Sequence, residues 1–562
     1  MFDFFYRRDR NEISHTILQT CTIAIFVVMY GIGVYTIRIG FITSLIPAFI
    51  MSALFLYIVD RKLFYALWAK ENTYVTIVAL IVSIIFSFRA YINLWRVADG
   101  SIDCAVFRTV GMMMSKGYMP YRDTFDHKGP LMYLINYAGY CIDEDRGIIV
   151  IEILFMAVTV AMIYKTCRII CDRISSTLVT FLSLSLLSSM FQGGNLVEEY
   201  AMAFIAVSVY FFLDYLKNDQ ISNVRLCLCG ICFGGVLLLR PNMCSVWLIL
   251  PFAVLYKMVK ERKIKELFRF LSFFILGLAV SILPVLVWLD VNDSLEWCWK
   301  AYILFNKEYV TGDGISTSIA RLGVVKDFLN YPVILMAFSL QLYAVIKRKH
   351  FYDIAYLIYL VVTLVLISIS GRSYGHYGMI LIPAVAYSLG QFFLFAKEIE
   401  NDKIYKIIRL AVTVWLLSTF ILQDLIAVAI GIPTAYLQRN TEQRSKTALH
   451  ISQIIQANTT KDQLISVYGY WDAIYIISKR AHATRFSYQY PLCVVEPKIK
   501  DEYFRELNEQ KPKVIVVQAG SCSNHPFYDE SMKAFLNENG YSLEYSEKGE
   551  SMDGALLFLL EE

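Results

Sequence analysis

The feature that most constrains this chain is a series of apolar runs, each long enough to cross a lipid bilayer. A membrane-spanning helix needs about 20 mainly apolar residues, because no water is present in the hydrocarbon core to satisfy a non-helical backbone. The runs cover 16–36, 40–59, 74–94, 147–164, 176–191, 200–216, 226–240, 243–257, 270–289, 331–346, 352–370, 377–396 and 408–431. The sequence therefore predicts an α-helical polytopic membrane protein with about 13 transmembrane helices.

The composition agrees with this class. Hydrophobic residues make up 57% of the 562 residues, and the mean hydropathy is +0.51. The formal net charge of +4 is too small to indicate nucleic-acid binding, so we expect no nucleic-acid partner. The apolar runs lead us to expect contact with membrane lipids. Because the start of the chain is polar, we expect no cleavable signal, and we expect the first apolar run to be a retained anchor.

The distribution of Lys and Arg predicts the orientation in the membrane. Short loops that would be cytoplasmic with the N-terminus inside are basic, among them Lys257 to Arg269 and Lys347-Arg348-Lys349. We therefore expect a multi-pass protein of the cell membrane with a cytoplasmic N-terminus. An odd number of spans places the C-terminal part outside.

The last part of the chain, 437–562, has a different pattern. Short β-branched runs such as 463–469 and 513–519 alternate with helical patterns, which predicts a small extracytoplasmic α/β domain. The predicted domains are thus 1–436, transmembrane with an outer loop at 95–146, and 437–562. The spacing leaves open whether Cys493 and Cys522 form a disulfide.

Polar residues collect at the ends of the predicted spans on the outer face. Such residues are costly at the ends of apolar helices unless they are paired or functional. They are Asp103 after span three; Arg122, Asp123, Asp126, His127 and Lys128 in the segment YRDTFDHKGP; Glu198 and Glu199; Arg240; and Arg372 and His376. Their convergence from different loops predicts a reaction chamber at membrane level.

Each of these residues also has a purely structural interpretation. Asp103 could cap a helix, Arg122 and Asp123 could form a surface ion pair, and Glu198 and Glu199 suit the positive end of a helix dipole. Arg240 could extend to lipid headgroups, and His376 could hydrogen-bond a neighbouring helix. The functional interpretation depends on the residues meeting in one place.

The order and spacing of these motifs resemble the GT-C class of integral-membrane glycosyltransferases, in the branch of protein O-mannosyltransferases, the lipid A aminoarabinose transferase and bacterial relatives. The resemblance is carried by Asp103, by Gly117 to Asp123, by Asp126 to Leu131, and by the segments VEEYA, LLLRPN and GRSYGHY. The sequence departs from the family pattern in two places, since Cys104 replaces the usual Glu and Lys128-Gly129-Pro130 replaces His-Pro-Pro.

The resemblance implies a membrane enzyme that moves a hexosyl or pentosyl unit from a polyprenyl-phosphate sugar donor to a glycan, lipid or protein acceptor in cell-envelope glycan biosynthesis. We expect Asp103 to be the catalytic base, and Arg372, His376, Arg240 and Lys128 to bind the donor phosphate. The residues left to bind sugar or acceptor, or to shape the site, are Arg122, Asp123, Asp126, His127, Glu198 and Glu199. Direct displacement would invert the anomeric centre, although a covalent route through Asp123 or Asp126 stays open. No cofactor is certain, and the use of a divalent metal stays open.

Three other functions compete with this one. A transporter or flippase would place charges near the middle of the membrane, often in inverted halves. A lipid-linked polysaccharide ligase or polymerase would also act on the outer face, and a non-enzymatic envelope scaffold would make the convergence of charges accidental.

Overall fold

A computed structural model describes residues 70–219, 221–311, 318–398, 402–416, 436, 444–522, 525–547 and 554–561. The chain divides into two compact units, residues 1–84 and residues 85–562. The predicted spans 16–36 and 40–59, and most of 408–431, lie outside the described residues. The predicted domain boundary at residue 436 stays a prediction, because most of the chain between 417 and 443 also lies outside them.

Long apolar helices make up most of the described chain. They are α4 (Glu71–Ser87), α7 (Ile148–Arg168), α8 (Arg173–Leu184) with α9 (Leu187–Met190), α10 (Val197–Asn218), α11 (Asn223–Leu237), α12 (Ser245–Lys260), α13 (Ile264–Val291), α16 (Ser318–Leu329), α17 (Pro332–Arg348), α18 (Phe351–Ser368), α19 (Leu381–Lys397) preceded by η4 (Gly375–Ile380), and α20 (Asp402–Leu416). Six spans among the described residues are long and apolar enough to cross a membrane, and the bent pair α16 and α17 would make a seventh.

The predicted number of thirteen spans is therefore not confirmed. Several predicted spans correspond to helices that are shorter than a full crossing, such as α11 with 15 residues and α12 with 16. The predicted span 74–94 is also too long, because α4 ends at Ser87 and the following residues turn. Hydropathy alone does not register where a helix stops.

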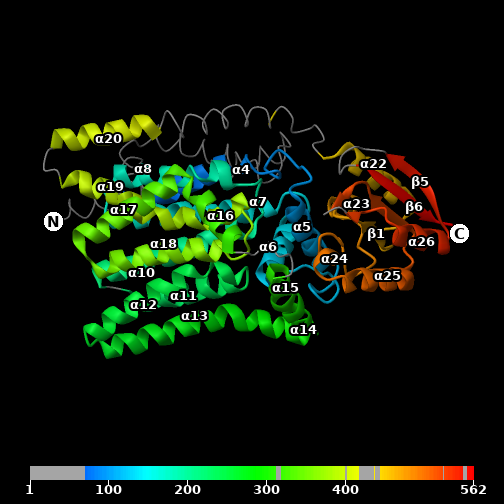
Figure 1. Cartoon of the computed structure of the whole chain (residues 1–562), viewed down its shortest axis with the longest axis horizontal. Coiled ribbons are helices and arrows are strands. Elements are labelled where there is room, and N and C mark those ends of the chain that lie inside the picture. The colour runs from blue at the N-terminus through cyan, green and yellow to red at the C-terminus, as the bar shows by residue number, and fades with distance from the viewer. Residues whose placement is uncertain are drawn as a thin grey trace, which may run out of the picture. The chain divides into compact units, whose positions relative to one another are not determined.

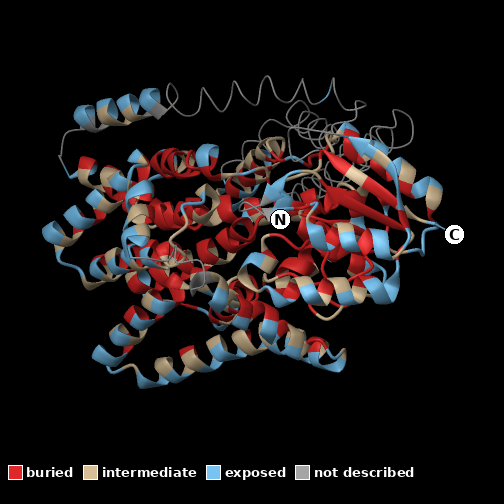
Figure 2. Cartoon of the chain, turned by 45° about the vertical axis from the view of Figure 1, so that its right-hand side comes forward, coloured by how far each residue is buried: buried red, intermediate tan, exposed pale blue. Residues whose placement is uncertain are grey.

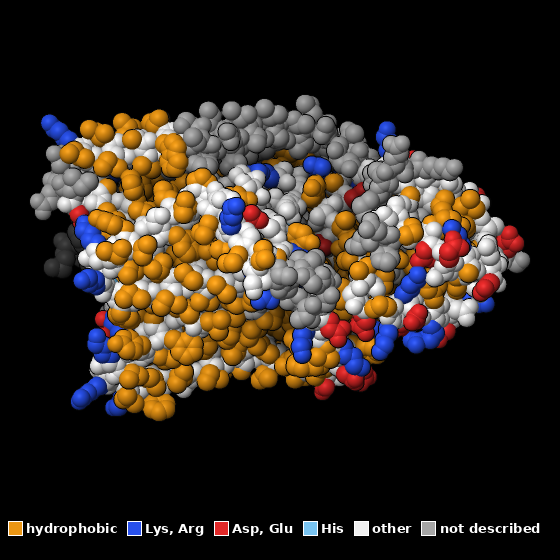
Figure 3. All heavy atoms as spheres, viewed as in Figure 1, with side chains coloured by type: hydrophobic (Ala, Val, Ile, Leu, Met, Phe, Trp, Pro, Cys, Tyr) orange, Lys and Arg blue, Asp and Glu red, His pale blue; other side chains and the backbone are white. Residues whose placement is uncertain are grey.

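Burial separates the inner helices from the outer ones. Most residues of α10 are buried, whereas α13 exposes many apolar side chains, among them Phe268, Ile275, Leu283 and Val287. In Figure 2 the long helix α13 is mostly tan and pale blue. Figure 3 shows hydrophobic side chains covering the helices on this face, with Lys and Arg gathered at one end of them. Exposed apolar faces of this kind are those that contact lipid in membrane proteins.

The C-terminal part forms a four-stranded mixed sheet flanked by helices (Figure 1). The strand order is β1-β2-β6-β5, with β1 (Ile465–Tyr468) parallel to β2 (Val514–Gln518), and β6 (Ala555–Leu560) antiparallel to both β2 and β5 (Tyr541–Glu547). A short ladder joins β3 (Ser521–Cys522) to β4 (His525–Pro526). The helices are α22 (Lys446–Asn458), α23 (Ala473–Ser478), α24 (Leu492–Val495), α25 (Lys498–Gln510) and α26 (Glu530–Glu538). A parallel pair needs a crossover, and the helices between β1 and β2 provide it. The question of whether Cys493 and Cys522 form a disulfide stays open, because the side chain of Cys522 lies outside those described.

Two helices of the predicted outer loop lie between the long helices and the sheet. These are α5 (Ile102–Ser115) and α6 (Pro130–Ile142). Ala105 and Met112 of α5 belong to the same buried cluster as Ile465 of β1 and Ile474 of α23. The first outer loop and the C-terminal sheet thus share one hydrophobic core, although more than 300 residues separate them in sequence.

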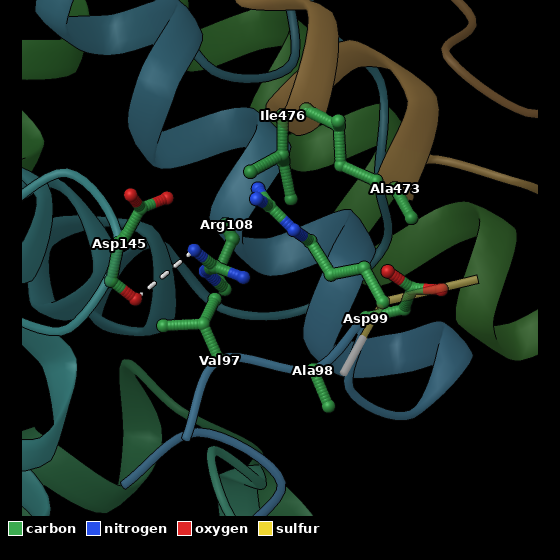
Figure 4. A pocket seen from close by; sticks show the side chains of 9 residues that line it. Val97, Ala98, Asp99, Arg108, Asp145, Ala473 and Ile476 are labelled. Atoms are coloured by element: carbon green, nitrogen blue, oxygen red, sulfur yellow. Dashed lines mark hydrogen bonds between the residues drawn. The ribbon is translucent and has the colours of Figure 1, made fainter. Parts of the chain in front are cut away.

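Both flanks of α5 are fixed. A Cβ at Gly111 would lie 2.7 Å from the backbone carbonyl carbon of Asn136, so only glycine permits the close approach of α5 to α6. On another flank, Arg108 donates a hydrogen bond of 3.2 Å to the backbone oxygen of Asp145, beside Ala473 and Ile476 (Figure 4). These contacts define the position from which the first turn of α5 presents Asp103.

Candidate functional site

Asp103 lies in the first turn of α5 and is half-buried. The helix is capped by Ser101, whose Oγ accepts a hydrogen bond from the backbone N–H of Cys104, so the interpretation of Asp103 as the cap is wrong. The Asp103 carboxylate instead accepts a 3.0 Å hydrogen bond at Oδ1 from the phenol of Tyr470 in the C-terminal part. The side chain of Asp103 is thus available for chemistry rather than used by the helix.

The segment that ends in His127-Lys128-Gly129 is joined to the end of α11 through its backbone. The N–H of Gly129 donates to the carbonyl of Leu239 at 3.1 Å. A Cβ at Gly129 would lie 2.1 Å from the carbonyl oxygen of Leu238, so the contact requires glycine. Within the segment, buried Tyr121 has a positive φ of 69° and its hydroxyl donates to the carbonyl of Lys128 at 2.8 Å. This arrangement places Lys128 next to the turn that carries Arg240.

Asp126 is buried and satisfied by two phenols. Its carboxylate accepts hydrogen bonds from Tyr133 at 2.9 Å and from Tyr488 at 2.7 Å. Burial tends to lower the pKa of Lys128, but the carboxylates of Asp126 and Asp103 outweigh it and hold that pKa above its ordinary value. Lys128 is therefore a fixed cation at neutral pH.

His127 lies among cations and is itself neutral. Lys128 Nζ donates to His127 Nε2 at 2.8 Å, so this ring nitrogen is the acceptor. Burial is the main reason that the pKa of His127 lies well below its ordinary value. The charges of Lys128, Arg240 and Arg372 lower it further, while Asp103 opposes them. Lys128 Nζ also lies 5.9 Å from the ring centroid of Phe107, which brings this cation to the turn of α5 that follows Asp103.

An aromatic contact links Arg372 to this cluster. The Arg372 guanidinium carbon lies 4.0 Å above the ring centroid of Tyr309, and this ring lies 5.4 Å from that of His127. Tyr309 belongs to α15 (Asn306–Thr311), which follows α14 (Leu295–Cys298) and the π-helical segment η3 (Trp299–Phe305). The aromatic stretch from Trp297 to Tyr309 therefore forms one wall of the site. Trp299 and Leu304 remain exposed.

Arg240 is held by an ion pair and a ring. It lies at the end of α11, where its Nη1 is 2.7 Å from Glu198 Oε1 and its guanidinium carbon is 4.3 Å from the centroid of Tyr377. The Tyr377 ring contacts the His376 ring at 4.8 Å, and His376 Nδ1 lies 2.7 Å from Gln192 Oε1. His376 thus lies beside the cation cluster and is bound to an amide.

Glu199 belongs to a different, buried network. Its carboxyl group lies near that of Glu152 on α7, whose Oε1 accepts a hydrogen bond from the backbone N–H of Asn195. The Asn195 amide donates to Asn136 at 2.8 Å and to the thiol of Cys104 at 3.5 Å. Burial raises the pKa of Cys104 to about 11, so the residue next to Asp103 is an uncharged thiol.

Arg122 and Asp123 form a bidentate pair, as their ion-pair interpretation predicts. Arg122 Nε and Nη2 each lie 2.8 Å from an Asp123 oxygen, and Arg122 Nη1 donates to the carbonyl of Asn292 at 2.8 Å. Asp123 also accepts from the backbone N–H of Met119 at 2.7 Å. The pair joins the segment to the end of α13.

Several residues of the site were not identified from the sequence. Tyr470 and Tyr488 come from the C-terminal part, and Tyr309 and Tyr377 contact the arginines. The chain contains 38 tyrosines, so no single one stands out in the sequence. Among the described residues, no three His, Cys, Asp or Glu side chains are grouped so that they could hold a metal ion.

Comparisons with known proteins agree with this picture. Residues 127–288 match the family model described as dolichyl-phosphate-mannose-protein mannosyltransferase. The fold is similar to that of ArnT from Cupriavidus metallidurans in two structures. The structure bound to undecaprenyl phosphate gives a TM-score of 0.55 at 12% identity, covering 87% of this chain and 98% of that one. The apo structure gives 0.51 at 13% identity, covering 86% and 96%. No curated protein matches the chain. These findings confirm the resemblance to the GT-C class of membrane glycosyltransferases.

Proposed function

We propose that this protein is a membrane glycosyltransferase that moves a sugar from a polyprenyl-phosphate donor to a cell-envelope acceptor on the outer face of the membrane, with inversion at the anomeric carbon. The observation that carries the proposal is geometric. Lys128 Nζ lies 2.8 Å from His127 Nε2 and 5.9 Å from the ring of Phe107, one turn after Asp103 on α5, and the His127 ring contacts the Tyr309 ring on which Arg372 lies. One fold serves many chemistries, so the proposal depends on these side chains and not on the fold likeness.

The cations suit a phosphate leaving group. Charge grows on the bridging oxygen as the glycosidic bond breaks, and fixed cations in a site of low dielectric stabilise that charge strongly. Arg372 and Arg240 are each held against a ring, at 4.0 Å from Tyr309 and 4.3 Å from Tyr377, so their guanidinium groups need little reorganisation. The similar ArnT structure bound to undecaprenyl phosphate supports a donor with a polyprenyl-phosphate group.

Asp103 suits the role of general base. An acceptor hydroxyl attacks the anomeric carbon and gives its proton to the Asp103 carboxylate, while the carbon–oxygen bond to phosphate breaks and its electron pair stays on the phosphate. The neutral acid and the additional phosphate charge balance this step. Proton removal of this kind contributes about 10²–10⁴-fold to the rate. In this mechanism Asp126 and His127 shape the site, and Glu198 orients Arg240.

The orientation is part of the proposal. Basic residues such as Lys257, Lys347 and Arg348 lie at the ends of the long helices, and basic loops are retained in the cytoplasm. Asp103 and the C-terminal sheet belong to the segments that this rule assigns to the outer face. The site would therefore open to lipid-linked donors in the outer leaflet.

The test is to supply purified protein in vesicles with a radiolabelled polyprenyl-phosphate sugar and a lysate fraction of envelope acceptors. We expect release of polyprenyl phosphate and a labelled acceptor with the wild type, and neither with Asp103→Asn. Glu144→Gln, which alters an exposed carboxylate beyond α6, is the matched control and should transfer normally. Movement of the intact donor across the vesicle would indicate a flippase, and transfer by Asp103→Asn at the wild-type rate would remove Asp103 as the base.

A further inference from the structure

The C-terminal part reaches the site with two tyrosines that touch its two acids. Tyr470 donates to Asp103 Oδ1 at 3.0 Å, and Tyr488 donates to Asp126 Oδ1 at 2.7 Å. The two rings stack on each other, with centroids 4.9 Å apart and planes 24° apart. The two acids at either end of the 103–126 segment are therefore bridged by one stacked pair from a segment more than 360 residues away in sequence.

The segment that carries the pair is fixed by the ends of the sheet. The backbone N–H of Tyr470 donates to Gln518 Oε1 at 2.7 Å, at the end of β2. Gly469 donates to Gln489 Oε1 at 2.9 Å and accepts from the Gln489 N–H at 3.1 Å, which ties the two tyrosine-bearing stretches together. A Cβ at Gly469 would lie 2.7 Å from the Gln518 side chain. The position of the Tyr470 phenol is thus determined by the sheet and not by the membrane helices.

The hydrogen bond leaves Asp103 able to act. A carboxylate has two oxygens, and within the described part of the chain Oδ2 of Asp103 accepts no hydrogen bond. Tyr470 therefore holds one oxygen and fixes the plane of the carboxylate, while the other oxygen can receive a proton. Burial, with the nearby charge of Asp103, keeps the pKa of Tyr470 well above its ordinary value, so the phenol stays a donor at neutral pH.

We propose that Tyr470 is a positioning residue that aims the Asp103 carboxylate at the acceptor hydroxyl, and that Tyr488 holds Tyr470 in place through the stacked ring and Asp126. The proposal rests on the proposed function of Asp103 as base. It assigns to the C-terminal part a role in the chemical step itself, because a general base that is misplaced by about 1 Å loses much of its effect.

The test compares Tyr470→Phe and Tyr488→Phe with the control Tyr490→Phe. The Tyr490 phenol is buried in the same segment, but it donates to Asp529 and not to Asp103 or Asp126. A hydrogen bond to a charged group contributes enough for Tyr470→Phe to lower kcat by about 10–100-fold, with the donor KM within about twofold. A donor that favours the charged carboxylate has been removed, so the acid limb of the pH–kcat profile should move to higher pH. Tyr488→Phe should change kcat in the same direction by less, and Tyr490→Phe should change neither kcat nor the profile.

The outcomes distinguish the positioning role of Tyr470 from the role of Asp103 as general base. If Asp103→Asn abolishes transfer while Tyr470→Phe matches Tyr490→Phe in kcat and pH profile, the positioning role is wrong and the base assignment stands. If Asp103→Asn transfers normally, the proposed function itself fails. If Tyr470→Phe does not fold, the profile of Tyr488→Phe decides, and an unchanged profile overturns the proposal.

Discussion

Arg240 and Glu198 face each other across 2.7 Å, with the Glu198 side chain only 4% exposed and the Arg240 side chain 24% exposed. The arginine follows α11 and the glutamate opens α10, so the pair joins the ends of two neighbouring helices. The same guanidinium lies against Tyr377. A guanidinium group that is fixed by an ion pair and a ring can bind a phosphate with little loss of side-chain freedom.

Glu198→Gln removes the countercharge and leaves Arg240 partly buried without it. We expect the donor KM to rise about 10-fold because the guanidinium loses its fixed position, and the free energy of unfolding to fall by about 2–3 kcal/mol, below the range of a fully buried pair. Donor-dependent kinetics and detergent-solubilised unfolding measure the two effects. Asp214→Asn is the matched control, since Asp214 lies on α10 as Glu198 does and forms a more exposed pair with Arg225 of α11. A similar rise in the donor KM for both variants would contradict a specific role for Glu198.

Gly129→Ala places a methyl group 2.1 Å from the carbonyl oxygen of Leu238, where nothing flexible can move aside. The backbone must separate, and Lys128 moves with it. We expect kcat/KM to fall at least about 10-fold and the midpoint of thermal unfolding to fall as well. Gly323→Ala, which meets nothing within 4 Å, should leave both quantities unchanged. Full activity of Gly129→Ala would show that the position of Lys128 is not set by this contact.

Arg372→Lys keeps the charge and removes the planar fork. Because a guanidinium matches two phosphate oxygens and stacks on Tyr309, whereas an ammonium does neither, we expect the donor KM to rise about 10-fold in Arg372→Lys and further in Arg372→Ala. Arg505→Lys, on an exposed face of α25, serves as the control. If Arg372→Lys behaves as the wild type, the site requires charge but not the bidentate geometry.

The pH dependence of stability should reveal Asp472. This residue precedes α23, and burial raises its pKa to about 7, with the Ser487 hydroxyl partly opposing and the Asp126 carboxylate adding to the rise. In the unfolded chain an aspartate ionises near pH 4, so the wild type is stabilised below that pH and loses this stabilisation as the pH rises toward 7.

Asp472→Asn removes this dependence. The variant should match the wild type near pH 4 and become more stable than the wild type between pH 4 and pH 7, with the gain levelling off above. Unfolding midpoints at four or five pH values in this range measure it. Asp529→Asn is an unsuitable control because Asp529 caps α26, so Asp501→Asn, exposed on α25, is preferable and should show no such trend. A constant difference between Asp472→Asn and the wild type at all pH values would contradict the assignment.

The predictable part of the site consisted of charged residues near apolar runs. Asp103, Lys128, Arg240 and Arg372 could be selected because a charge beside a lipid-length run is costly and therefore informative. Arg122 and Asp123 carry the same signal, yet they form a bidentate pair that holds the segment to α13. Charge and position in the sequence cannot distinguish a catalytic residue from one in a structural ion pair, since burying either charge in lipid is costly.

What the sequence determined by itself is the material of the fold: long apolar segments that must become helices because lipid offers their backbone no partners, and a C-terminal alternation that must become strands and helices. The tertiary structure alone decided which distant groups meet. Tyr470 reaches Asp103 because α5 packs into the core of the C-terminal sheet, and Lys128 lies beside the turn that carries Arg240 because Gly129 lets two backbones touch. The local sequence specifies the periodicity and polarity of each helix or strand. Contacts between residues far apart in sequence depend on how whole elements pack against each other, and no single segment contains that information.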